Sequence, residues 1–593
     1  MTQESKQCQN CKTPFTIEPD DFAFYEKIKV PPPTFCTQCR MQRRMGFRNE
    51  RVLYKRTCEM CGKAVIGAYR EKTAFPVYCQ SCWWTDKWDP MVYGSDYDFN
   101  KPFFEQMREL QNKVPRQHIN NTEGSTSINS DYTNCAGELK NCYLIFGALR
   151  DEDCAYGHYI NDSHNCVDVL YCFKSQNCYS CLDIESCYNL FYSHSCVQCR
   201  DSFFLFDCRN CSHCIGCVGL RNKQYCILNT QYSKEAFEKA KEALRLHTSS
   251  GLAAFKEKFL ALSLIMLRKY YHGQMNKDFS GDYIASVENT HESFYIKNAR
   301  GCKFVFWCNN AEDVYDYFSW GDAELAYECV STGQNTYRSS FIHSAWNGNK
   351  EIEYSSLCFS SSYLFGCIGL RNKKYCILNK QYSEEEYRKL RVKIIEQMRE
   401  QPYTDKKGNT YSYGEFFPLE ISPFYYTDSV AQEHFPLTKE QVLAHGLLWE
   451  DPKEKAHEPS LRPENVPETI KEVPDTIGKE IIGCLHQGKC NEQCTFAFKI
   501  TPFELTFYRR FSIPLPQLCH NCRHYERVKM RSPLKLWHRR CACTGTASEN
   551  GAYTNTISHA HGVECCPNEF ETSYAPDRPE IVYCEQCYQA EVI

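Results

Sequence analysis

The sequence predicts a multidomain, mainly β protein: a parallel β-solenoid core with helical caps and a helical insertion, flanked by a duplicated cysteine-rich module at its two ends. Three observations lead to this fold class. The 593 residues include 40 cysteines, and many near the termini form C-x2-C pairs. Cysteines in the middle of the chain recur at about every twelfth position, and one segment occurs twice. A short, fixed period of strand-forming and turn-forming residues is typical of stacked parallel strands.

The N-terminal module contains four C-x2-C pairs in a row. Its candidate ligands are Cys8, Cys11, Cys36, Cys39, Cys58, Cys61, Cys79 and Cys82. A C-x2-C knuckle turns two thiolates to one side of a tight loop, and a second knuckle completes the four ligands that Zn²⁺ prefers. Eight thiolates therefore predict two zinc ions, and counting alone leaves sequential and alternate pairing open. Disulfides are the alternative, but they require an oxidising compartment, and the polar N-terminus does not look like a signal peptide.

The C-terminal end repeats this module, with Cys519 and Cys522 in the places of Cys36 and Cys39. Its candidate ligands are Cys490, Cys494, Cys519, Cys522, Cys541, Cys543, Cys584 and Cys587. Two pairs depart from C-x2-C, because three residues separate Cys490 from Cys494 and one separates Cys541 from Cys543. The last two pairs are also farther apart than in the N-terminal copy, and the inserted residues contain rival ligands: His559, His561, Cys565 and Cys566. The two ends together predict about four zinc ions.

Each copy shows the same order of elements: a knuckle, an alternating segment suited to a β-hairpin (14–25 and 496–508), a proline-ended loop, and a second knuckle that opens a helix. This order is treble-clef-like. Both copies have Phe four residues past the first knuckle, an FY pair, and an arginine (Arg40, Arg523) directly after the second knuckle. At these residues each end resembles the "probable zinc-ribbon" family, which implies a zinc-binding fold and sequential pairing of knuckles but no activity. The whole chain resembles uncharacterised bacterial zinc-ribbon proteins with a Cys-rich repeat core.

The middle of the chain carries the repeated cysteines. They are Cys142, Cys154, Cys166, Cys178, Cys187, Cys199, Cys211 and Cys226. Most follow Asn, Ser or Gln, and aromatic or β-branched runs lie between them. We expect the cysteines to face inward as a stack of small apolar side chains, and the Asn residues to occupy corners where left-handed backbone is tolerated. Metal binding is the alternative, because Cys178-x2-Cys181 and three further pairs have knuckle spacing. Two inward-facing core positions in each repeat of the solenoid, here called a rung, would produce the same spacing.

A second copy of the repeat argues for a structural stack. Residues 216–237 recur at 366–387 with 16 of 22 positions identical. The rungs before this second copy hold few cysteines, and other small or apolar residues occur where the stack would place them: Val314, Ala326, Thr336 and Ser355. A packed core accepts such replacements and a zinc site does not. Both copies end in a strand and a helix that we expect to cover the solenoid end, with a capping box at Ser383 and Glu386 in the second.

The predicted organisation has seven parts. They are a tandem zinc-binding module (1–90), a connector with one helix near 102–113 (91–130), the first half of the solenoid (131–229), a helical insertion with a helix over 252–271 (230–290), the second half (291–382), a capping helix and a proline-rich extended linker at 452–474 (383–480), and a second tandem zinc-binding module (481–593). We expect a tryptophan cluster (Trp83, Trp84, Trp88) to dock the first module. The repeated GLRNK loop, at 219–223 and 369–373, is predicted to be structural, with a ligand loop as the alternative.

Charge separates the candidate functions. The 69 basic and 73 acidic residues give a net charge of −4, so attraction to nucleic acid requires local patches. Residues 36–56 and 519–540 each hold seven basic residues and one acid. The candidate phosphate contacts are Arg40, Arg43, Arg44, Arg48, Arg523, Arg527, Lys529 and Arg531. We therefore predict a non-enzymatic zinc-binding protein that binds RNA or DNA through these helices. The alternative is that the basic side chains form a solvated face of each helix and bind no partner.

A protein-interaction scaffold that uses the solenoid faces and the zinc ribbons is the alternative function. An enzyme is the least favoured class, because the chain has no Gly-rich nucleotide loop, G-x-S-x-G elbow or H-E-x-x-H motif. Carboxylates in the repeats also lack a common phase. Apolar runs fall short of the roughly 18 residues that a membrane span needs. We therefore expect a cytoplasmic protein with no membrane partner.

Overall fold

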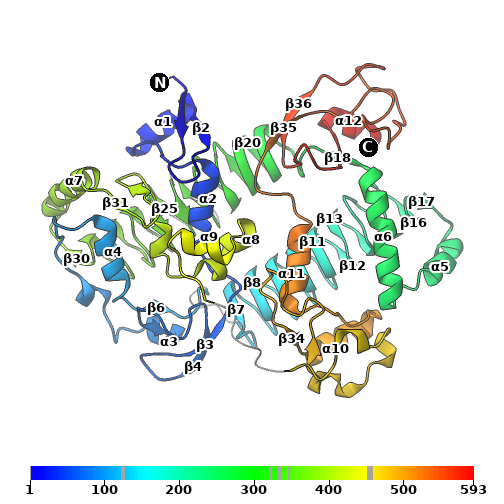
Figure 1. The fold of residues 1–593 in the computed structure, drawn as a ribbon, viewed down its shortest axis with the longest axis horizontal. Coiled ribbons are helices and arrows are strands. Elements are labelled where there is room, and N and C mark those ends of the chain that lie inside the picture. Colours follow the sequence, from blue (N-terminus) through cyan, green and yellow to red (C-terminus); the bar gives the residue numbers. More distant parts are fainter. Residues whose placement is uncertain are drawn as a thin grey trace. The chain divides into compact units, whose positions relative to one another are not determined.

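The computed structural model describes residues 2–121, 127–319, 323–324, 326–331, 336–344, 347–450 and 458–592. It is rich in β-sheet, includes large parallel sheets, and carries several helices (Figure 1). The chain forms two compact units, each assembled from segments that are distant in sequence. Unit 1 comprises Met1–Asn120, Tyr271–Glu450 and Leu534–Leu536, and unit 2 comprises Asn121–Tyr270, Asp451–Pro533 and Trp537–Ile593. The N-terminal cysteine module thus shares a unit with the second half of the repeat, and the C-terminal module with the first half.

The first half of the repeat is a stack of parallel strands, here called the first ladder. Its strands are β7 (Thr133–Gly137), β8 (Tyr143–Leu149), β9 (Ala155–Asn161), β10 (Val167–Phe173), β11 (Tyr179–Glu185), β12 (Tyr188–Phe191), β13 (His194–Val197), β14 (Arg200–Phe203), β15 (Ser212–Ile215), β16 (Gln224–Ile227) and the antiparallel β17 (Thr230–Gln231). Neighbouring strands follow one another in chain order, except that both β12 and β13 pair with β11. The register pairs residue i with residue i + 12, as in Ala155↔Val167 and Val167↔Tyr179. The predicted period is confirmed.

A three-residue pattern underlies this 12-residue step. Every third residue from Cys135 to Leu228 has a positive φ, and up to Cys217 the residue that follows it is buried in the core. Asn occupies many of the left-handed positions, as predicted, because its short polar side chain tolerates this backbone. The amides also form a ladder of their own: Asn165 Nδ2 donates to Asn177 Oδ1 (2.7 Å), and Asn177 Nδ2 donates to Asn189 Oδ1 (3.0 Å). Each 12-residue step therefore has four inward positions, where the sequence analysis expected two.

The inward positions hold the repeated cysteines in one buried cluster with Ile, Leu, Val and Ala. Their thiols donate to backbone carbonyls of their own strand and of the next step; Cys142 Sγ lies 3.4 Å from both Lys140 O and Asp151 O. An inward serine makes equivalent bonds, because Ser163 Oγ donates to the carbonyls two residues before and nine residues after it (3.1 and 3.3 Å). Cys and Ser are thus interchangeable hydrogen-bond donors in this core.

The second half of the repeat, the second ladder, belongs to unit 1. Its strands are β19 (Gly273–Gln274), β20 (Lys277–Arg300), β21 (Phe306–Asn309), β22 (Tyr317–Phe318), β23 (Ala323–Glu324), β24 (Cys329–Val330), β25 (Thr336–Tyr337), β26 (Ile342–His343), β27 (Lys350–Glu353), β28 (Ser362–Phe365), β29 (Lys374–Ile377) and the antiparallel β30 (Lys380–Gln381). The residues expected to replace cysteine in the stack are all buried, which confirms their placement: Val314, Ala326, Thr336 and Ser355.

Helices follow both ladders. They are α5 (Lys234–Ala243) and α6 (Ser249–Ile265) in unit 2, and α7 (Glu384–Glu400) in unit 1. The capping box at Ser383 and Glu386 is present at the start of α7. Phe255 and Phe259 of α6 pack against aromatic residues of the first ladder. Helix α6 ends before the predicted position 271, because the chain turns there into β18 (Leu267–Lys269), which pairs with β37 (Ile581–Tyr583).

The remaining elements are the short strand pairs and helices of the cysteine modules and of the segments next to them. Unit 1 contains β1 (Glu4–Gln7), β2 (Pro14–Ile17), α1 (Pro19–Ile28), α2 (Thr37–Met45), β3 (Tyr54–Thr57), β4 (Ala64–Gly67), β5 (Val77–Tyr78), α3 (Gln80–Trp83), η1 (Pro90–Tyr93), α4 (Phe103–Gln111) and β6 (Arg116–Gln117), and later β31 (Tyr403–Thr404), β32 (Thr410–Tyr411), η2 (Leu419–Ile421), η3 (Tyr426–Asp428), α8 (Val430–His434) and α9 (Lys439–Ala444). Unit 2 contains η4 (Pro463–Asn465), η5 (Ile470–Glu472), η6 (Asp475–Lys479), β33 (Ile482–Gly483), β34 (Ala497–Phe498), α10 (Pro502–Phe511), α11 (His520–Lys529), β35 (Trp537–Arg540), β36 (Glu569–Thr572) and α12 (Glu585–Val592).

Two predictions about these segments are wrong. The alternating segments 14–25 and 496–508 do not form hairpins of their own: each is a strand followed by a helix, α1 or α10. Proline begins both helices, where its fixed φ suits the first turn, and a capping box precedes each. The prediction of an extended linker at 452–474 also fails over its second part, because Val466, Ile470 and Val473 are buried in a cluster with the first ladder; residues 451–457 lie outside the described part.

Candidate metal centres

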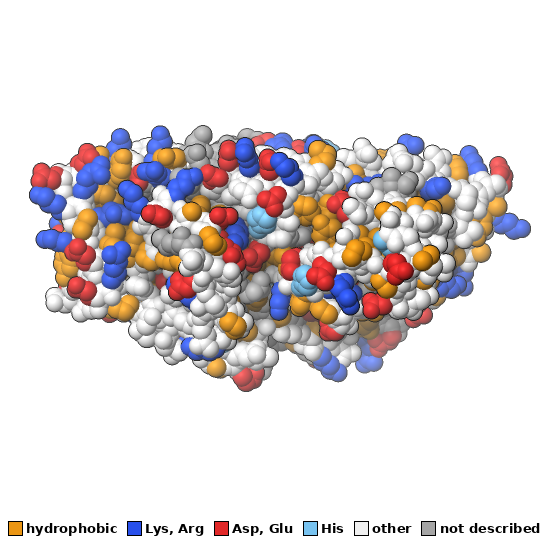
Figure 2. Space-filling model, turned by 90° about the horizontal axis from the view of Figure 1, so that it is seen from above, with side chains coloured by type: hydrophobic (Ala, Val, Ile, Leu, Met, Phe, Trp, Pro, Cys, Tyr) orange, Lys and Arg blue, Asp and Glu red, His pale blue; other side chains and the backbone are white. Residues whose placement is uncertain are grey.

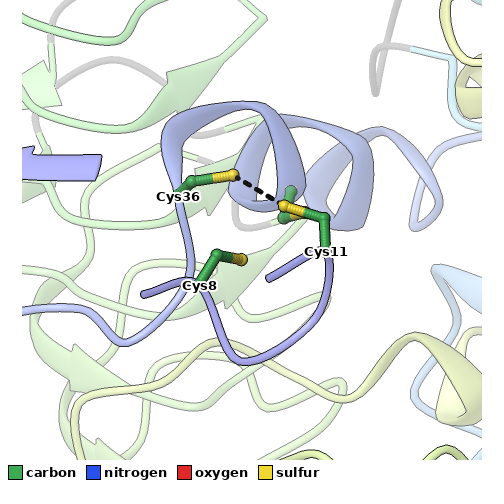
Figure 3. A group of neighbouring side chains, drawn as sticks. Cys8, Cys11 and Cys36 are labelled. Carbon is green, nitrogen blue, oxygen red and sulfur yellow. Dashed lines mark hydrogen bonds between the residues drawn. The ribbon is translucent and has the colours of Figure 1, made fainter. Parts of the chain in front are cut away.

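Among the described residues, several groups of four cysteines bring their sulfur atoms within 4.8 Å of one another, and four of them are considered below. The groups are Cys8, Cys11, Cys36 and Cys39; Cys58, Cys61, Cys79 and Cys82; Cys484, Cys494, Cys519 and Cys522; and Cys541, Cys566, Cys584 and Cys587. Figure 3 shows three members of the first group, with Cys11 Sγ 3.6 Å from Cys36 Sγ. All eight N-terminal cysteines take the predicted places. The pairing that counting left open is sequential, the first knuckle with the second and the third with the fourth.

The four groups share one local architecture. The first cysteine directly follows a strand: β1, β3, β33 or β35. The second cysteine lies three residues before the partner strand, β2, β4, β34 or β36. The third directly precedes a helix, α2, α3, α11 or α12, and the fourth lies in its first turn. A strand pair and a helix start thus hold every ligand, whereas the loop between the first two cysteines varies in length: 9–10, 59–60, 485–493 and 542–565.

The third group contains Cys484 where the sequence analysis expected Cys490. Cys484 directly follows β33 and accepts a hydrogen bond from the Cys519 backbone N–H at 3.3 Å, as Cys58 does from Cys79 N at 3.2 Å. Cys484 therefore occupies the first-ligand position of this group. Cys490 lies in the loop 485–493 beside the group, with its Sγ 3.7 Å from that of Cys522. Sequence spacing missed Cys484 because the loop is longer than a knuckle, although the apolar strand before it was a usable signal.

The fourth group contains Cys566 where the sequence analysis expected Cys543. Cys541 accepts a hydrogen bond from Cys584 N at 3.2 Å and is the first ligand. Its hairpin partner is Cys566, three residues before β36, and the Cys566 Sγ lies 3.7 Å from that of Cys587. Cys543 lies outside this group, in the loop 542–565. The insertion noted in the sequence therefore falls inside a knuckle and not between two knuckles.

The thiol chemistry of these groups fits a metal that prefers sulfur. Hydrogen bonding to the Cys541 thiol lowers the pKa of Cys584 to about 4. Hydrogen bonds with neighbouring thiols likewise lower the pKa of Cys8 and that of Cys519 far below the ordinary value for a thiol. The same bonds raise the pKa of the thiols that donate them, as in Cys39, Cys522 and Cys541. A thiolate is the form that binds a metal ion, and four thiolates in a closed, tetrahedral set are the ligands of structural zinc sites.

The basic helix α2 faces the second ladder. Arg40 Nε and Arg44 NH1 lie 2.9 and 2.7 Å from the same carboxylate oxygen of Asp316. The side chains of the two arginines are 2% and 1% exposed, and that of Asp316 is not exposed at all. Burial alone would lower the pKa of Arg40, but the Asp316 carboxylate raises it above its ordinary value. The guanidinium is therefore held charged in the interior.

The basic helix α11 faces the first ladder in the same way. Arg523 Nε lies 2.9 Å from Asp168 Oδ2, and Arg527 NH2 lies 3.2 Å from Asp168 Oδ1. In Figure 1, α11 lies across the strands of this ladder. Arg523 also faces Glu504 of α10. The tyrosine of the FY pair beside it, Tyr508, is buried against Tyr179 of the ladder, 5.6 Å between ring centroids.

The remaining candidate phosphate contacts are mostly buried too. Arg43 pairs with Glu328 and Glu415, and Arg48 pairs with Glu50. Arg531 NH1 donates to the hydroxyl of Tyr171 at 3.4 Å. Lys529 is the exposed exception, and it forms ion pairs with Glu492 and Glu526. The expectation of a basic face open to solvent is thus corrected: the helices direct these arginines toward carboxylates and aromatic rings of their own unit.

The GLRNK loops also contact the modules. Arg371 lies over the ring of Trp83, 4.1 Å from its centroid, and donates to the Trp83 carbonyl. Arg221, at the corresponding place in the first ladder, donates to the hydroxyl of Tyr588 at 3.0 Å. Trp83 and Tyr588 each directly follow the last cysteine of a module. Both loops therefore contact the end of a cysteine module, which supports the predicted structural role, and the tryptophan cluster packs beside the first module as predicted.

No protein-family model and no curated protein matches this chain. Within the described ranges, no helix is both long enough and apolar enough to span a membrane.

Proposed function

We propose that this chain is a non-enzymatic zinc protein that acts as a protein-interaction scaffold. Four tetracysteine sites each bind one zinc ion and stabilise treble-clef-like modules. These modules pack against two parallel β-solenoids. The observation that carries this proposal is the burial of the module arginines against ladder carboxylates. The charge that suggested nucleic acid in the sequence is used inside each unit, to join the modules to the ladders.

Zinc is the metal that suits these sites best. Each has four thiolates held by backbone elements, with no carboxylate or carbonyl oxygen in the group, so Mg²⁺ and Ca²⁺ are poor candidates. Closed tetrathiolate sites leave no open position for substrate, which is the mark of a structural site. Zinc binding then supports folding of the hairpins and of α2 and α11, since small modules of this kind have little apolar core of their own.

The ladders support the scaffold role, because they repeat the same surface groups at fixed spacing. Exposed ion pairs join neighbouring steps, as between Lys140 and Glu152 and between Arg150 and Asp162. Over the face shown in Figure 2, basic and acidic side chains are intermixed. Mixed charge of this kind suits complementary protein surfaces, whereas a phosphate backbone attracts a stripe of one sign. Regular side faces are the surfaces that repeat proteins use for partners.

Affinity capture with charge-reversal variants tests the scaffold role. The full chain, and a variant with Lys140→Glu and Arg150→Glu, should be used as bait after nuclease treatment and at high salt. We expect a defined set of proteins to remain bound to the wild type and to be lost from the variant. Arg388→Glu on α7 is the matched control, because Arg388 forms an exposed ion pair with Glu384; it should retain the set.

Direct titration with single- and double-stranded RNA and DNA tests the alternative. Nucleic-acid binding through α2 and α11 requires the arginines to leave buried partners. We therefore expect no binding tighter than about 10 μM at moderate salt. Tighter binding whose salt dependence falls when Arg40, Arg43, Arg44 and Arg48 are replaced, or capture that disappears with nuclease, would overturn the scaffold proposal in favour of nucleic acid.

A further inference from the structure

The loop 542–565 of the fourth cysteine group carries a second set of metal-binding side chains. Cys543, His559 and His561 of this loop bring their ligand atoms within 4.8 Å of one another and of Cys587 Sγ. Cys587 is also a member of the tetracysteine group with Cys541. Two four-membered groups therefore meet at one sulfur atom.

The ring nitrogens of both histidines are directed at thiols. His559 Nδ1 lies 3.1 Å from Cys543 Sγ, and His561 Nε2 lies 3.2 Å from Cys587 Sγ. Cys543, Cys587 and His559 are buried, at 1%, 3% and 5% exposure. His561 is partly buried. Two Cys with two His form one of the usual ligand sets of zinc.

The other ring nitrogens are held by oxygen acceptors. His559 Nε2 lies 2.8 Å from a carboxylate oxygen of Glu591, whose side chain is not exposed. His561 Nδ1 lies 2.8 Å from the backbone oxygen of Glu564. An acceptor on one nitrogen keeps the proton there and leaves the other nitrogen free to bind a metal, which is how metal-binding histidines are commonly oriented. The oxygen acceptors on the two histidines are an observation separate from the grouping of the cysteines, and they also indicate a zinc ion.

Glu591 is itself firmly placed. Its carboxylate accepts from Thr556 N at 2.8 Å and from the Tyr553 hydroxyl at 2.9 Å. The last helix, α12, thus holds both the shared sulfur and the acceptor for His559, while the loop supplies the remaining ligands. The Cys543 thiol accepts from Gly545 N and from Asn555 Nδ2, at 3.4 and 3.2 Å, as a metal-bound thiolate would.

We propose that this loop binds a fifth zinc ion, bridged to the fourth by the Cys587 thiolate. One ion takes Cys541, Cys566, Cys584 and Cys587, and the other takes Cys543, His559, His561 and the same Cys587. Charge favours the bridge: a zinc ion with four thiolates carries −2, whereas two zinc ions with five thiolates and two neutral imidazoles carry −1. The proposal goes beyond the four-zinc scaffold, and a metal count distinguishes the failures of the two.

The first test is the zinc content of the purified full chain. We expect five zinc ions per chain, and four after His561→Ala or after His559→Ala. Cys565→Ser is the matched control, because Cys565 is exposed in the same loop and next to a ligand; it should keep five. Four ions in the wild type, unchanged by either histidine substitution, would overturn the second site, and none at all would overturn both zinc proposals.

The second test concerns the bridge and does not depend on the folding of any variant. The wild-type protein is exchanged with ¹¹³Cd²⁺, which binds the same ligands, and studied by NMR. Two cadmium ions that share one sulfur show mutual scalar coupling, so we expect two coupled resonances, one for a four-sulfur site and one for a two-sulfur, two-nitrogen site. Five resonances without any coupling would overturn the bridge.

Discussion

The N-terminal and C-terminal modules dock onto different ladders through the same contact. Two arginines one turn apart on α2 share Asp316, and the arginines at the corresponding positions of α11 share Asp168. Both carboxylates are buried, so in each contact two guanidinium groups of the module form ion pairs with one buried aspartate of the ladder. Such a pair is costly to desolvate and costly to break. The shared contact therefore fixes where a module sits, whatever the sequence around it.

The two contacts differ at the residue directly before the second of the paired arginines. In α2 this residue is Arg43, which pairs with Glu328 and Glu415 in the interior. In α11 it is Glu526, which is 41% exposed and pairs with Lys529. The N-terminal contact thus buries a third arginine with two further acids, where the C-terminal contact has a partly exposed glutamate and one further buried acid, Glu504. The two arginines that share one aspartate are common to both contacts and suffice for docking. The additional buried charges around Arg43 make the stability of unit 1 more sensitive to the loss of any one of them.

Removing the metal should have the largest effect on both contacts. Structural zinc contributes about 10–16 kcal/mol to the folding of zinc-finger peptides, so a strong chelator should unfold the modules and release α2 and α11. The ladders should stay folded, because their buried thiols donate to backbone carbonyls. Hydrogen exchange measured strand by strand would show this order. Loss of protection in β8–β11 before α11 would contradict it.

Removing the shared acid should have the next largest effect. Asp316→Ala and Asp168→Ala each remove the carboxylate that two buried guanidinium groups share, and we expect a loss of about 3–5 kcal/mol from the unit concerned. Denaturant unfolding followed by hydrogen exchange in each unit would measure it. Asp162→Ala is the control, since its pair with Arg150 is exposed and should contribute less than about 1 kcal/mol. Equal losses in the three variants would break the comparison between buried and exposed pairs.

Ladder cysteines should have a smaller effect, alike in both units. Cys154→Ala, Cys166→Ala in the first ladder and Cys358→Ala in the second should each cost about 1–2 kcal/mol, through lost packing and a lost thiol donor. The serine variants should cost less, because inward serines already make the same bonds. Zinc content should stay unchanged. A zinc ion lost with any of these substitutions would show that the ladders are metal sites.

The smallest effect is a pH dependence confined to unit 1. Burial, together with the nearby Arg116, lowers the pKa of His343 to about 3. The folded state therefore prefers the neutral imidazole, and this contribution to stability is complete above the ordinary pKa near 6.5 and is lost as the pH falls toward 3. At pH 5.5 the loss amounts to about 1.4 kcal/mol. His343→Gln should remove this part of the pH dependence from unit 1 and leave unit 2 as it was.

Local spacing predicted a large part of this architecture. The eight N-terminal ligands and the 12-residue step of the ladder follow from short-range pattern, because a knuckle and a rung are each closed by nearby backbone. The same logic failed at Cys484 and Cys566, where the long loops 485–493 and 542–565 separate ligands that a strand pair brings together. The strands before and after each pair carry that information more reliably than the spacing of the cysteines.

Long-range burial is the part that the sequence did not reveal. A run of arginines on a helix has the same composition whether it faces solvent or an acid hundreds of residues away. Asp168 and Asp316 each stand among several other acids in the repeats, and nothing in their neighbours marks them as the partners. The prediction of a basic surface therefore depended on an assumption about exposure, which only the three-dimensional fold could test.

The interleaved order of the two units has a consequence for synthesis on the ribosome. Arg40 precedes its partner Asp316 by 276 residues, and Asp168 precedes Arg527 by 359. At roughly 5–20 residues per second, each half-made contact waits tens of seconds for its counterpart to be translated. During that interval the nascent chain exposes an unpaired basic helix and an open, acid-lined strand stack. Productive maturation thus depends on keeping these two surfaces from engaging the wrong copy, within one chain or between neighbouring chains on a polysome.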